Sequence, residues 1–302
     1  MKIAIVGGAG QLGSALVREL SGDHVHVIGL TRRAVDVTSP DALDHLTSLA
    51  PDVIINCSAW NDVDGAETQP DAAFAVNRDG VALLAKAAGR CDAVLVHFST
   101  DFVFDGAAGE PYVEESIASP LNAYGRSKLA GEQAARQLDR HYVLRLSSVF
   151  GGRMGEGRGG WGTIDRIVDA LVAGREIRAF ADRTVSPSYT VDVARATRAL
   201  LTLGAPFGVY HCVSSEWTTW HRLAEEAARL VQSPSRIVPV SAADAVTVAT
   251  RPRFCALSNA KLTAAGISMP AWQHALRRHV AVRSGRAPLG SPSPEQVVTL
   301  RP

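Results

Sequence analysis

Tyr124 and Lys128 are the pair of side chains with the clearest chemical potential in this chain. They lie four residues apart in a stretch whose pattern predicts a helix over residues 122–138. That spacing places both side chains on one helix face, about one turn apart. A nearby ammonium favours the ionised phenolate, so we expect the pKa of Tyr124 to be lowered from about 10 towards neutrality, which suits a general acid or base. A solvated pair on a helix surface is the alternative, and two features upstream argue against it.

The first of these features is Ser99-Thr100-Asp101, which follows an apolar run that predicts a strand over residues 93–98. In an open parallel sheet, ligands bind outside the carboxyl ends of the strands. Thr100 and Asp101 are therefore candidate substrate-binding residues. A turn or a helix cap is the commoner role of these residue types after a strand, but the Tyr124–Lys128 pair on the next long helix favours the functional interpretation.

The second feature is the glycine-rich turn Gly7-Gly-Ala-Gly10-Gln11-Leu12-Gly13, which joins an apolar strand pattern to a helical pattern. Strand, glycine turn and helix are the context that a dinucleotide-binding fingerprint requires. Gly7 permits the tight turn, Gly10 lets the backbone approach a pyrophosphate, and Gly13 allows close helix–strand packing. The N–H groups of the helix start, at Gln11 and Leu12, then face negative charge. The spacing is Gly-x-x-Gly-x-x-Gly, so a plain glycine-rich turn is the alternative.

The residues after the second predicted strand, 25–30, indicate which nicotinamide cofactor is bound. A cofactor with a free ribose 2′-OH prefers an acidic residue there, but the sequence has Arg32 and Arg33. Two guanidinium groups favour a 2′-phosphate, hence NADPH, with NADH as the alternative cofactor. Solvated loop arginines are the other interpretation. Asp36 and Val37 follow, where we expect the adenine ring.

The order of elements predicts an α/β fold with a Rossmann-type doubly wound parallel sheet. Strand patterns over 2–6, 25–30, 52–56, 93–98 and 141–146 alternate with helical patterns that include 41–49, 71–89 and 122–138. The third strand is followed by the segment Ser58-Ala59-Trp60. Its first two residues are small and would let a cofactor pass close to the strand ends. We expect residues 1–150 to form the dinucleotide-binding domain, with later segments returning to it, 151–282 mainly a smaller α/β substrate-binding cap, and 283–302 a flexible tail. The glycine-rich stretch 151–162 is a candidate substrate lid.

Composition narrows the class of partner. The chain of 302 residues is 46% hydrophobic and 20% charged, with a net charge of +1, so no field steers it towards nucleic acid or an anionic membrane. The four cysteines form no Cys-x-x-Cys and the histidines no His-Glu-x-x-His, so no metal site is predicted. No signal peptide and no apolar run of eighteen residues is present, which predicts a cytoplasmic protein acting on a small molecule.

Together these residues resemble the extended short-chain dehydrogenase/reductases, and within them the dTDP-4-dehydrorhamnose reductase family. The likeness runs from Met1 to about Val280. Its motifs are Gly-Gly-Ala-Gly-Gln-Leu-Gly at Gly7, Pro-Asp-Val-Ile-Ile-Asn at Pro51, Val63-Asp64 with Ala66-Glu67, Phe-Ser-Thr-Asp-Phe-Val-Phe-Asp-Gly ending at Gly106, Pro-Leu-Asn-Ala-Tyr-Gly-Arg-Ser-Lys-Leu-Ala-Gly-Glu at Pro120, Ser186-Pro187 with Tyr189-Thr190 and Asp192, and Arg251-Pro252.

The resemblance implies NAD(P)H-dependent reduction of a 4-keto sugar nucleotide. By position, Tyr124 matches the proton donor, Lys128 its partner on the nicotinamide ribose, and Thr100 the hydroxyl that holds the carbonyl oxygen. In the cap, Arg251 is a candidate for pairing with the diphosphate of the substrate; a surface salt bridge is its alternative role. A homodimer is one assembly that the sequence leaves open.

The sequence departs from the family pattern in the sugar pocket. Where the family usually has Ser-Trp-Val-Tyr, this chain has Ser147-Ser148-Val149-Phe150, and Phe254-Cys255 stands for Asn-Ser. A valine, Val185, also replaces a usual glycine. Ser148 is thus a candidate substrate-binding residue where an indole wall is missing, and Trp60 or Trp161 is a candidate to refill it. An intact catalytic set beside an altered pocket favours a related reductase that acts on a different sugar nucleotide, with the rhamnose-pathway reductase itself as the alternative.

Two other functions stay open at this point. The first is a sugar-nucleotide epimerase or dehydratase of the same superfamily, which recycles its cofactor. The second is a non-catalytic NADP-binding regulatory subunit, similar to that of methionine adenosyltransferase. Net consumption of NADPH distinguishes a reductase from both.

Overall fold

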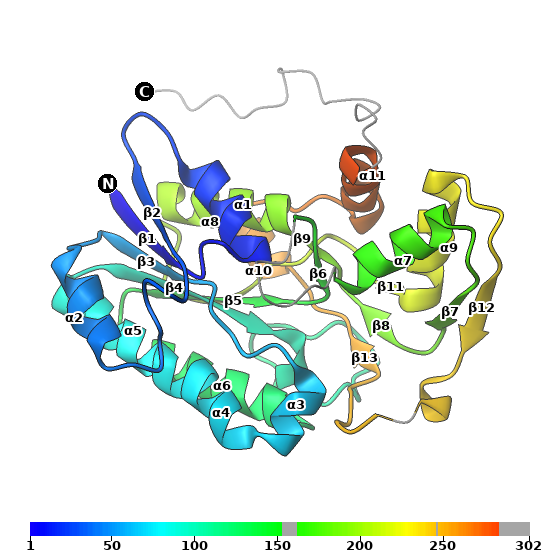
Figure 1. The fold of residues 1–302 in the computed structure, drawn as a ribbon, viewed down its shortest axis with the longest axis horizontal. Helices are drawn as coiled ribbons and strands as arrows, with labels where there is room; N and C mark the ends of the chain where they lie inside the picture. Colours follow the sequence, from blue (N-terminus) through cyan, green and yellow to red (C-terminus); the bar gives the residue numbers. More distant parts are fainter. Residues whose placement is uncertain (153–161, 246, 284–302) are drawn as a thin grey trace.

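The computed structural model describes residues 1–152, 162–245 and 247–283. The predicted lid therefore lies almost wholly outside the described residues, as do Trp161 and the predicted tail beyond residue 283. Six parallel strands form the large sheet, in the order β10-β5-β4-β3-β1-β2 (Figure 1). They are β1 (Lys2–Val6), β2 (His26–Leu30), β3 (Val53–Asn56), β4 (Val94–Thr100), β5 (His141–Leu146) and β10 (Gly208–His211).

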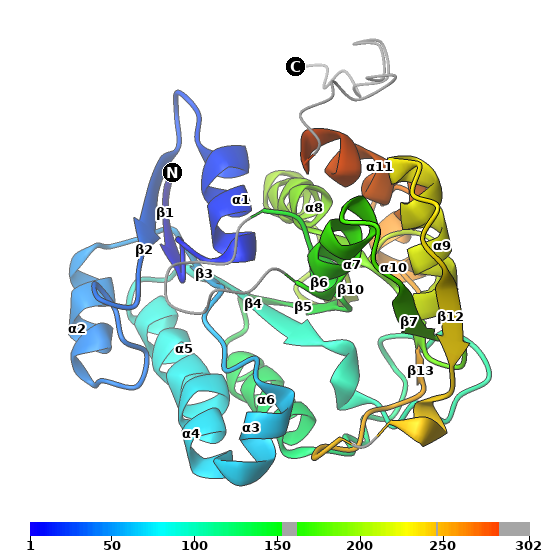
Figure 2. The ribbon, with the colours of Figure 1, turned by 45° about the vertical axis from the view of Figure 1, so that its right-hand side comes forward.

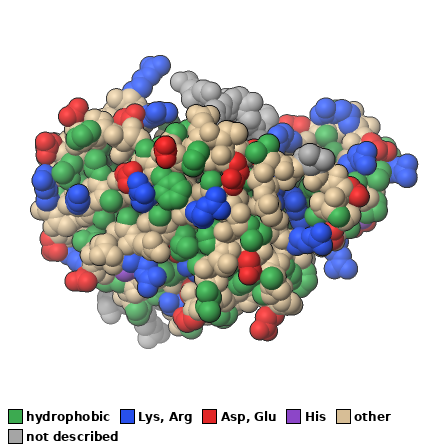
Figure 3. Space-filling model, turned by 90° about the horizontal axis from the view of Figure 1, so that it is seen from below, with side chains coloured by type: hydrophobic (Ala, Val, Ile, Leu, Met, Phe, Trp, Pro, Cys, Tyr) green, Lys and Arg blue, Asp and Glu red, His purple; other side chains and the backbone are tan. Residues whose placement is uncertain are grey.

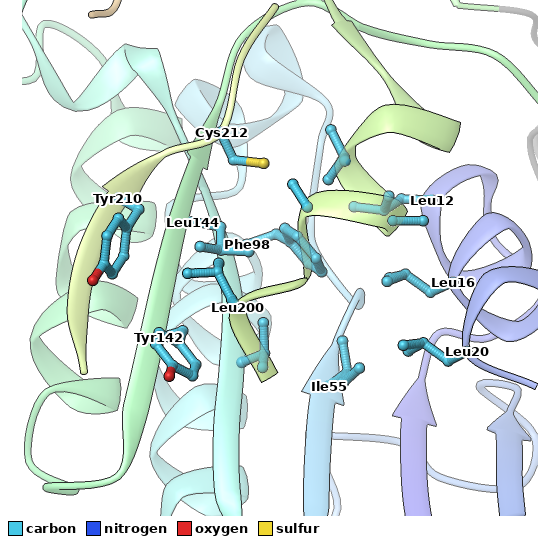
Figure 4. Packing of buried hydrophobic residues seen from close by; sticks show 14 of the residues in the cluster. Leu12, Leu16, Leu20, Ile55, Phe98, Tyr142, Leu144, Leu200, Tyr210 and Cys212 are labelled. Carbon is cyan, nitrogen blue, oxygen red and sulfur yellow. The ribbon is translucent and has the colours of Figure 1, made fainter. Parts of the chain in front are cut away.

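Helices cover both faces of this sheet, which confirms the predicted Rossmann-like fold (Figures 1 and 2). One face carries α1 (Gln11–Leu20) and α8 (Thr190–Leu203), and the other carries α2 (Asp41–Ser48), α5 (Gly80–Arg90) and α6 (Ala123–Ala135). The short strand β1 divides its side chains between the two layers, since residues of a strand alternate in direction. Ile3 and Ile5 enter the core under α1 and α8, whereas Ala4 and Val6 enter the core under α2 and α5. Figure 4 shows the first core, in which Leu12, Leu16 and Leu20 of α1 face the sheet.

The strand order places a topological switch point at β1. The chain passes from β1 to its neighbour β2 on one side, and then crosses to β3 on the other side. Ligands of open α/β sheets bind in the crevice outside the carboxyl ends of the strands at such a point. The glycine-rich turn follows β1 directly, so it lies at this crevice.

The predicted helix over 71–89 is present, but it contains a π-helical turn that the sequence pattern did not predict. The structure has α3 (Val63–Thr68), α4 (Pro70–Phe74), a π-helical turn (Ala75–Asp79) and then α5. The π turn presents the buried Asn77, whose side chain bonds both backbone groups of Trp60 and the hydroxyl of Ser127. Those tertiary hydrogen bonds offset the irregular helix geometry, and π turns are frequent at functional sites. Hydrophobic spacing along the chain does not report them.

The second half of the chain builds a smaller α/β layer beside the large sheet. Its helices α7 (Thr163–Val172), α9 (Trp220–Val231) and α11 (Trp272–Arg283) share a core that includes Phe150, Leu223 and Leu276. The short α10 (Ala260–Ala264) instead packs on β10. Short strands complete the region: β6 (Val149–Phe150), β7 (Ile177–Phe180), β8 (Thr184–Val185), β9 (Ser188–Tyr189), β11 (Thr218–Thr219), β12 (Ile237–Val240) and β13 (Phe254–Cys255).

The surface shows charges of both signs. On the face in Figure 3, basic and acidic side chains are interspersed rather than separated into areas of one sign. Within the described ranges, no helix has the length and apolar character needed to cross a membrane.

Helix α6, which carries Tyr124 and Lys128, is fixed by two contacts near its C-terminal end. A Cβ added at Gly131 would lie 2.1 Å from the carbonyl oxygen of Asn77, so the helix backbone packs directly on the π turn. One residue further on, Glu132 accepts two hydrogen bonds from Arg145 of β5, at 2.9 and 2.8 Å. Both side chains are buried, at 1% and 5% exposure. The two contacts set how closely α6 approaches the sheet.

We expect Gly131→Ala to lower the free energy of unfolding by about 1–3 kcal/mol, because the added methyl overlaps backbone that must move. Gly89→Ala in α5 is the matched control. Its new Cβ would meet only Leu138 Cδ1, at an ordinary 3.7 Å, so the helix propensity of alanine makes this change neutral or stabilising by up to about 1 kcal/mol. Urea unfolding followed by circular dichroism measures both. Equal effects of the two substitutions would contradict the close approach.

We expect Glu132→Gln to lower the free energy of unfolding by about 3–5 kcal/mol, because it leaves the Arg145 guanidinium buried without a counter-charge. Glu226→Gln removes a similar bidentate bond, but its partner Arg229 is 62% exposed, so water replaces the lost contact and no measurable loss is expected. The double variant Glu132→Gln with Arg145→Met should recover part of the loss, which a double-mutant cycle measures.

Candidate active site

The glycine turn has the geometry that close approach to an anion requires. Gly7 adopts a left-handed backbone with φ +78°, which a residue with a side chain rarely adopts. A Cβ on Gly13 would lie 2.2 Å from the Gly7 carbonyl oxygen, so α1 packs on the turn without space for a methyl. A Cβ on Gly10 would meet only that same oxygen, at 3.1 Å, which leaves its other side open.

The start of α1 offers free donors to this open side. Gly10 is the residue before the helix, no side chain caps the helix, and its first turn has no acidic residue. The amide nitrogen Nε2 of Gln11 is buried and has no hydrogen-bond partner among the described residues. Leu12 lies in the core, so only its backbone N–H faces the turn. An uncapped helix start with an unpaired amide fits the pyrophosphate of a dinucleotide.

The crevice continues along the end of β3. A Cβ on Gly7 would meet the backbone of Cys57 and Ser58 at 2.9 and 3.0 Å, so the two strand ends are close. Ser58 donates through its N–H and hydroxyl to Asn56 Oδ1, at 3.0 and 2.6 Å. Ala59 and Trp60 follow, and the indole of Trp60 packs on the small cluster that contains Tyr124. The predicted Ser58-Ala59-Trp60 segment therefore links the glycine turn to the candidate catalytic tyrosine.

The end of β2 presents the two predicted arginines to solvent. Arg32 forms a long, exposed contact of 3.5 Å with Asp36, and Arg33 has no side-chain partner among the described residues. Hydrogen bonds from Thr38 lower the pKa of Asp36. Val37 is buried against Gly80 of α5, so its side chain is a core residue and only its backbone is left for an adenine contact. The cationic end of β2 fits a 2′-phosphate.

Helix α6 begins where Tyr124 must be positioned. Asn122 caps the helix by accepting from the Gly125 N–H at 2.7 Å, and Glu67 accepts from the Ala123 N–H at 2.6 Å. A Cβ on Gly125 would lie 2.2 Å from the Phe102 carbonyl oxygen. Glycine at this position therefore lets α6 rest on the backbone that follows Thr100, which brings Tyr124 to the end of β4.

Tyr124 lies close to the Thr100 hydroxyl and to the Asp101 carboxyl, both of which influence the pKa of its phenol. The phenol is 9% exposed, and its ring makes an edge contact with Phe102 at 5.9 Å between centroids. Burial raises the pKa of Tyr124 to about 12, the Thr100 hydroxyl opposes the shift, and the Asp101 charge adds to it. The structure thus differs from the expectation of a lowered phenol pKa. The reason is desolvation, which disfavours the phenolate.

Lys128 lies one turn further along α6 and is 2% exposed. Its ammonium donates to the Phe98 carbonyl oxygen of β4 at 2.6 Å, rather than to Tyr124. Burial lowers the pKa of Lys128 to about 8, while Glu132 and Cys57 oppose the shift. Cys57, whose charge would act on Lys128, also borders Gly7, so the ammonium is on the side of α6 that faces the ends of β3 and β4. Two of its three N–H donors are left for a bound ribose.

Asp101 is the centre of a buried hydrogen-bond network at the end of β4. Its Oδ1 lies 2.9 Å from the Thr100 hydroxyl, and its Oδ2 accepts from the Ser147 hydroxyl at 2.7 Å. The thiol of Cys255, from β13, donates to the Pro252 carbonyl oxygen at 3.6 Å and lies close enough to this carboxyl for the two groups to influence each other's pKa. Asp101 is 4% exposed. Both carboxyl oxygens have partners within the protein, so the predicted direct contact of Asp101 with a substrate stays a prediction.

Two predicted substrate-binding residues lie apart from this network. Ser148 is half-buried with a left-handed φ of 46°. Arg251 forms a bidentate ion pair with Asp64, at 2.9 and 2.7 Å. This pair matches the alternative role considered for Arg251, and the guanidinium must exchange Asp64 for a diphosphate if it is to bind one.

Sequence reasoning missed the role of Ser147 and of the Cys255 thiol. One signal pointed to Ser147, because it follows β5, which neighbours β4 in the sheet. Carboxyl ends of adjacent parallel strands meet at one edge, so Ser147 and Asp101 are neighbours although they are 46 residues apart. No comparable signal locates Cys255, since a two-residue strand in the cap has no periodicity to read.

Comparison with known proteins agrees with this geometry. The family model "RmlD substrate binding domain" matches residues 1–284. A dTDP-4-dehydrorhamnose reductase of Streptomyces griseus is 33% identical over 299 residues, covering 96% of both chains. A dTDP-4-keto-6-deoxy-D-glucose reductase of Streptomyces niveus is 35% identical over 273 residues, covering 87% of this chain and 91% of the relative.

Among solved structures, the dTDP-4-dehydrorhamnose reductase of Bacillus anthracis in complex with NADP superposes with a TM-score of 0.86. It is 28% identical, and the match covers 92% of this chain and 98% of that one. Agreement in sequence and fold over nearly the whole length shows that this chain belongs to the RmlD substrate-binding domain family, the dTDP-4-dehydrorhamnose reductase family that its motifs indicate.

Proposed function

We propose that this protein is an NADPH-dependent reductase of the 4-keto group of a dTDP-linked 6-deoxysugar. One observation carries the proposal: the Tyr124 phenol and the Thr100 hydroxyl lie close together at the carboxyl end of β4, and the Lys128 ammonium is held on the Phe98 carbonyl oxygen of the same strand. The named activities of the relatives, reduction of dTDP-4-dehydrorhamnose and of dTDP-4-keto-6-deoxy-D-glucose, support the substrate class.

The residues of this chain divide the work of the reaction. Bound NADPH supplies the hydride that reduces the carbonyl carbon. The glycine turn and the free donors of α1 hold its pyrophosphate, and Lys128 holds the nicotinamide ribose. Thr100 donates a hydrogen bond to the carbonyl oxygen, where negative charge develops. Tyr124 gives its proton to that oxygen as the alkoxide forms.

The raised pKa of Tyr124 favours proton donation as the first task of this residue. A phenol with a pKa of about 12 is protonated at neutral pH, which is the state that a reductase needs at the start of its reaction. An epimerase begins in the opposite direction, because its tyrosine first removes a proton from a hydroxyl. The phenol of this chain is thus in the protonation state with which a reductase begins.

The sugar itself is set by the pocket, which has Ser148 where the family usually has tryptophan. We propose a 4-keto-6-deoxysugar that differs from dehydrorhamnose in ring substituents, with Trp60 lining the site beside Tyr124 and Arg251 exchanging Asp64 for the diphosphate. A cytoplasmic location and a homodimer belong to the same proposal.

The test is a screen of dTDP- and UDP-linked 4-keto sugars, in which the loss of NADPH absorbance is followed and each product is identified. Stoichiometric oxidation of NADPH with at least one dTDP-linked sugar is the expected result. If no 4-keto sugar is reduced while NADPH binds normally, the assigned activity is wrong and a binding role becomes the better description.

Tyr124→Phe removes the donated proton and leaves the ring in place. We expect kcat to fall by about 10²–10⁴-fold, the range of general acid catalysis, with the Kd for NADPH nearly unchanged. Tyr210→Phe is the matched control. Tyr210 is a buried residue of β10, and its hydroxyl donates to the Pro206 carbonyl oxygen. Stopped-flow turnover and NADPH fluorescence measure the two quantities. A Tyr124→Phe enzyme with normal kcat would remove Tyr124 from the chemistry.

Arg33→Ala tests the assignment of the end of β2 to the 2′-phosphate. A lost charge-assisted hydrogen bond costs about 1.5–3 kcal/mol, so we expect the KM for NADPH to rise by about tenfold or more and the KM for NADH to stay constant. Arg90→Ala, at the exposed end of α5, should change neither value. Steady-state kinetics with both cofactors give the comparison. An equal increase of the KM for NADPH and of the KM for NADH would show that Arg33 does not bind the 2′-phosphate.

A further inference from the structure

The Thr100 hydroxyl has more neighbours than its single proton can serve. A hydroxyl has one O–H donor and two lone pairs. The Asp101 carboxyl lies 2.9 Å from the Thr100 oxygen, the Phe102 N–H donates to that oxygen at 3.2 Å, and the Tyr124 phenol lies close enough to act on the same hydroxyl. The Phe102 N–H is a backbone group that can only donate and cannot rotate, so it always occupies one lone pair of the Thr100 oxygen. The protonation state of Asp101 decides how the rest is used.

When Asp101 is ionised, the Thr100 proton is held by the protein. A carboxylate only accepts hydrogen bonds, so Thr100 must donate its one proton to Asp101. The second lone pair of Thr100 is then open to the phenol O–H of Tyr124. In this arrangement Thr100 has nothing to donate to a carbonyl oxygen, and the proton of Tyr124 is directed to Thr100.

When Asp101 is neutral, both hydroxyl protons are released. The carboxylic O–H of Asp101 donates to Thr100, and this bond together with the Phe102 N–H fills both lone pairs of the threonine oxygen. The Thr100 proton is then free for the substrate oxygen. Tyr124 has lost its acceptor on Thr100, so its proton is also free for that oxygen.

The surroundings of Asp101 favour the neutral form. The carboxyl is 4% exposed, and a buried carboxylate without a cation is strongly disfavoured. Its neighbours are the uncharged donors Thr100 and Ser147, the Cys255 thiol on β13 and the Tyr124 phenol on α6. The Arg183 guanidinium acts on the neighbouring Cys255 thiol, and it is not among the groups that shift the pKa of Asp101. Burial raises the pKa of Asp101 to about 6, although the hydrogen bonds from Ser147 and Thr100 and the nearby Cys255 thiol oppose the shift.

We propose that Asp101 works as a neutral carboxylic acid that donates to Thr100, so that the protons of Thr100 and Tyr124 both point at the carbonyl oxygen of the substrate. Asp101 is thus a positioning residue that keeps its proton through the reaction. The alkoxide takes its proton from Tyr124, and no proton leaves Asp101. The inference rests on the proposed reductase activity. It adds that the site is active only when Asp101 is protonated.

Asp101→Asn is the decisive variant, because an amide is a permanent mimic of the neutral acid. Its Nδ2 can donate to Thr100 while its Oδ1 accepts from Ser147. We expect kcat/KM of the wild type to fall by about tenfold or more between about pH 5 and 7.5, a range below the pKa of Lys128, since this ratio reports the free enzyme. Asp101→Asn should keep its low-pH value over the whole range, and exceed the wild type at pH 7.5.

One further variant should move the pH profile without touching the acid, and a second variant is its control. Ser147→Ala removes a hydrogen bond that favours the ionised carboxyl, so the fall in kcat/KM should shift to higher pH. Ser48→Ala, at the exposed end of α2, should leave the profile in place. NADPH binding and thermal unfolding show that each variant is folded. Loss of activity in Asp101→Asn at every pH, or an inflection unmoved by both Asp101→Asn and Ser147→Ala, would overturn the proposal.

Infrared difference spectra of wild type against Asp101→Asn observe the proton without turnover. A protonated-carboxyl band at pH 5 that is absent at pH 8 is expected, and carboxylate bands alone at both values contradict the inference. This measurement also separates the two proposals. A wild type that reduces no 4-keto sugar rejects the assigned activity, whereas an active wild type without the band rejects only the role of Asp101.

Discussion

Exclusion of water at the carboxyl end of β4 is the constraint from which the chemistry of this site follows. Three ionisable side chains meet there, and burial shifts the pKa of each towards its neutral form. The pKa rises to about 12 for Tyr124 and to about 6 for Asp101, and it falls to about 8 for Lys128. Such a site disfavours isolated charge. An alkoxide can form there only if fixed hydrogen-bond donors meet it, and in a dry site these donors act with little screening.

The exclusion of water depends on how closely α6 approaches the sheet. Two glycines remove the methyl groups that would hold the helix away, Gly125 over the Phe102 carbonyl and Gly131 over the Asn77 carbonyl. The buried pair of Glu132 and Arg145 then ties the end of the helix to β5. A buried ion pair adds little stability over an apolar pair, but it accepts only one geometry. Its contribution here is to fix the distance at which Tyr124 faces Thr100.

Local patterns in the sequence predict the parts of this site that local chemistry determines. A strand followed by glycines and a helix indicates the dinucleotide turn, and a spacing of four places Tyr124 and Lys128 on one helix face. Such patterns do not predict that the Lys128 ammonium donates to the Phe98 carbonyl oxygen. They also do not predict the direction of the Tyr124 pKa shift, because a spacing shows which charges are near and not how much water is absent. The same holds for the π turn, whose cause is the tertiary bonding of Asn77.

Contacts between the cap and the large sheet explain why one departure from the family pattern concerns the chemistry as well as the sugar pocket. The position of Cys255 is one at which the family usually has serine, and in this fold its thiol lies near the carboxyl of Asp101 while it donates to the Pro252 carbonyl oxygen. A thiol is a weaker hydrogen-bond donor than a hydroxyl. Cysteine therefore stabilises an Asp101 carboxylate less than serine would, and it leaves more of the carboxyl protonated at a given pH. A substitution in the cap can thus change the electrostatics of the catalytic hydroxyls without touching either of them.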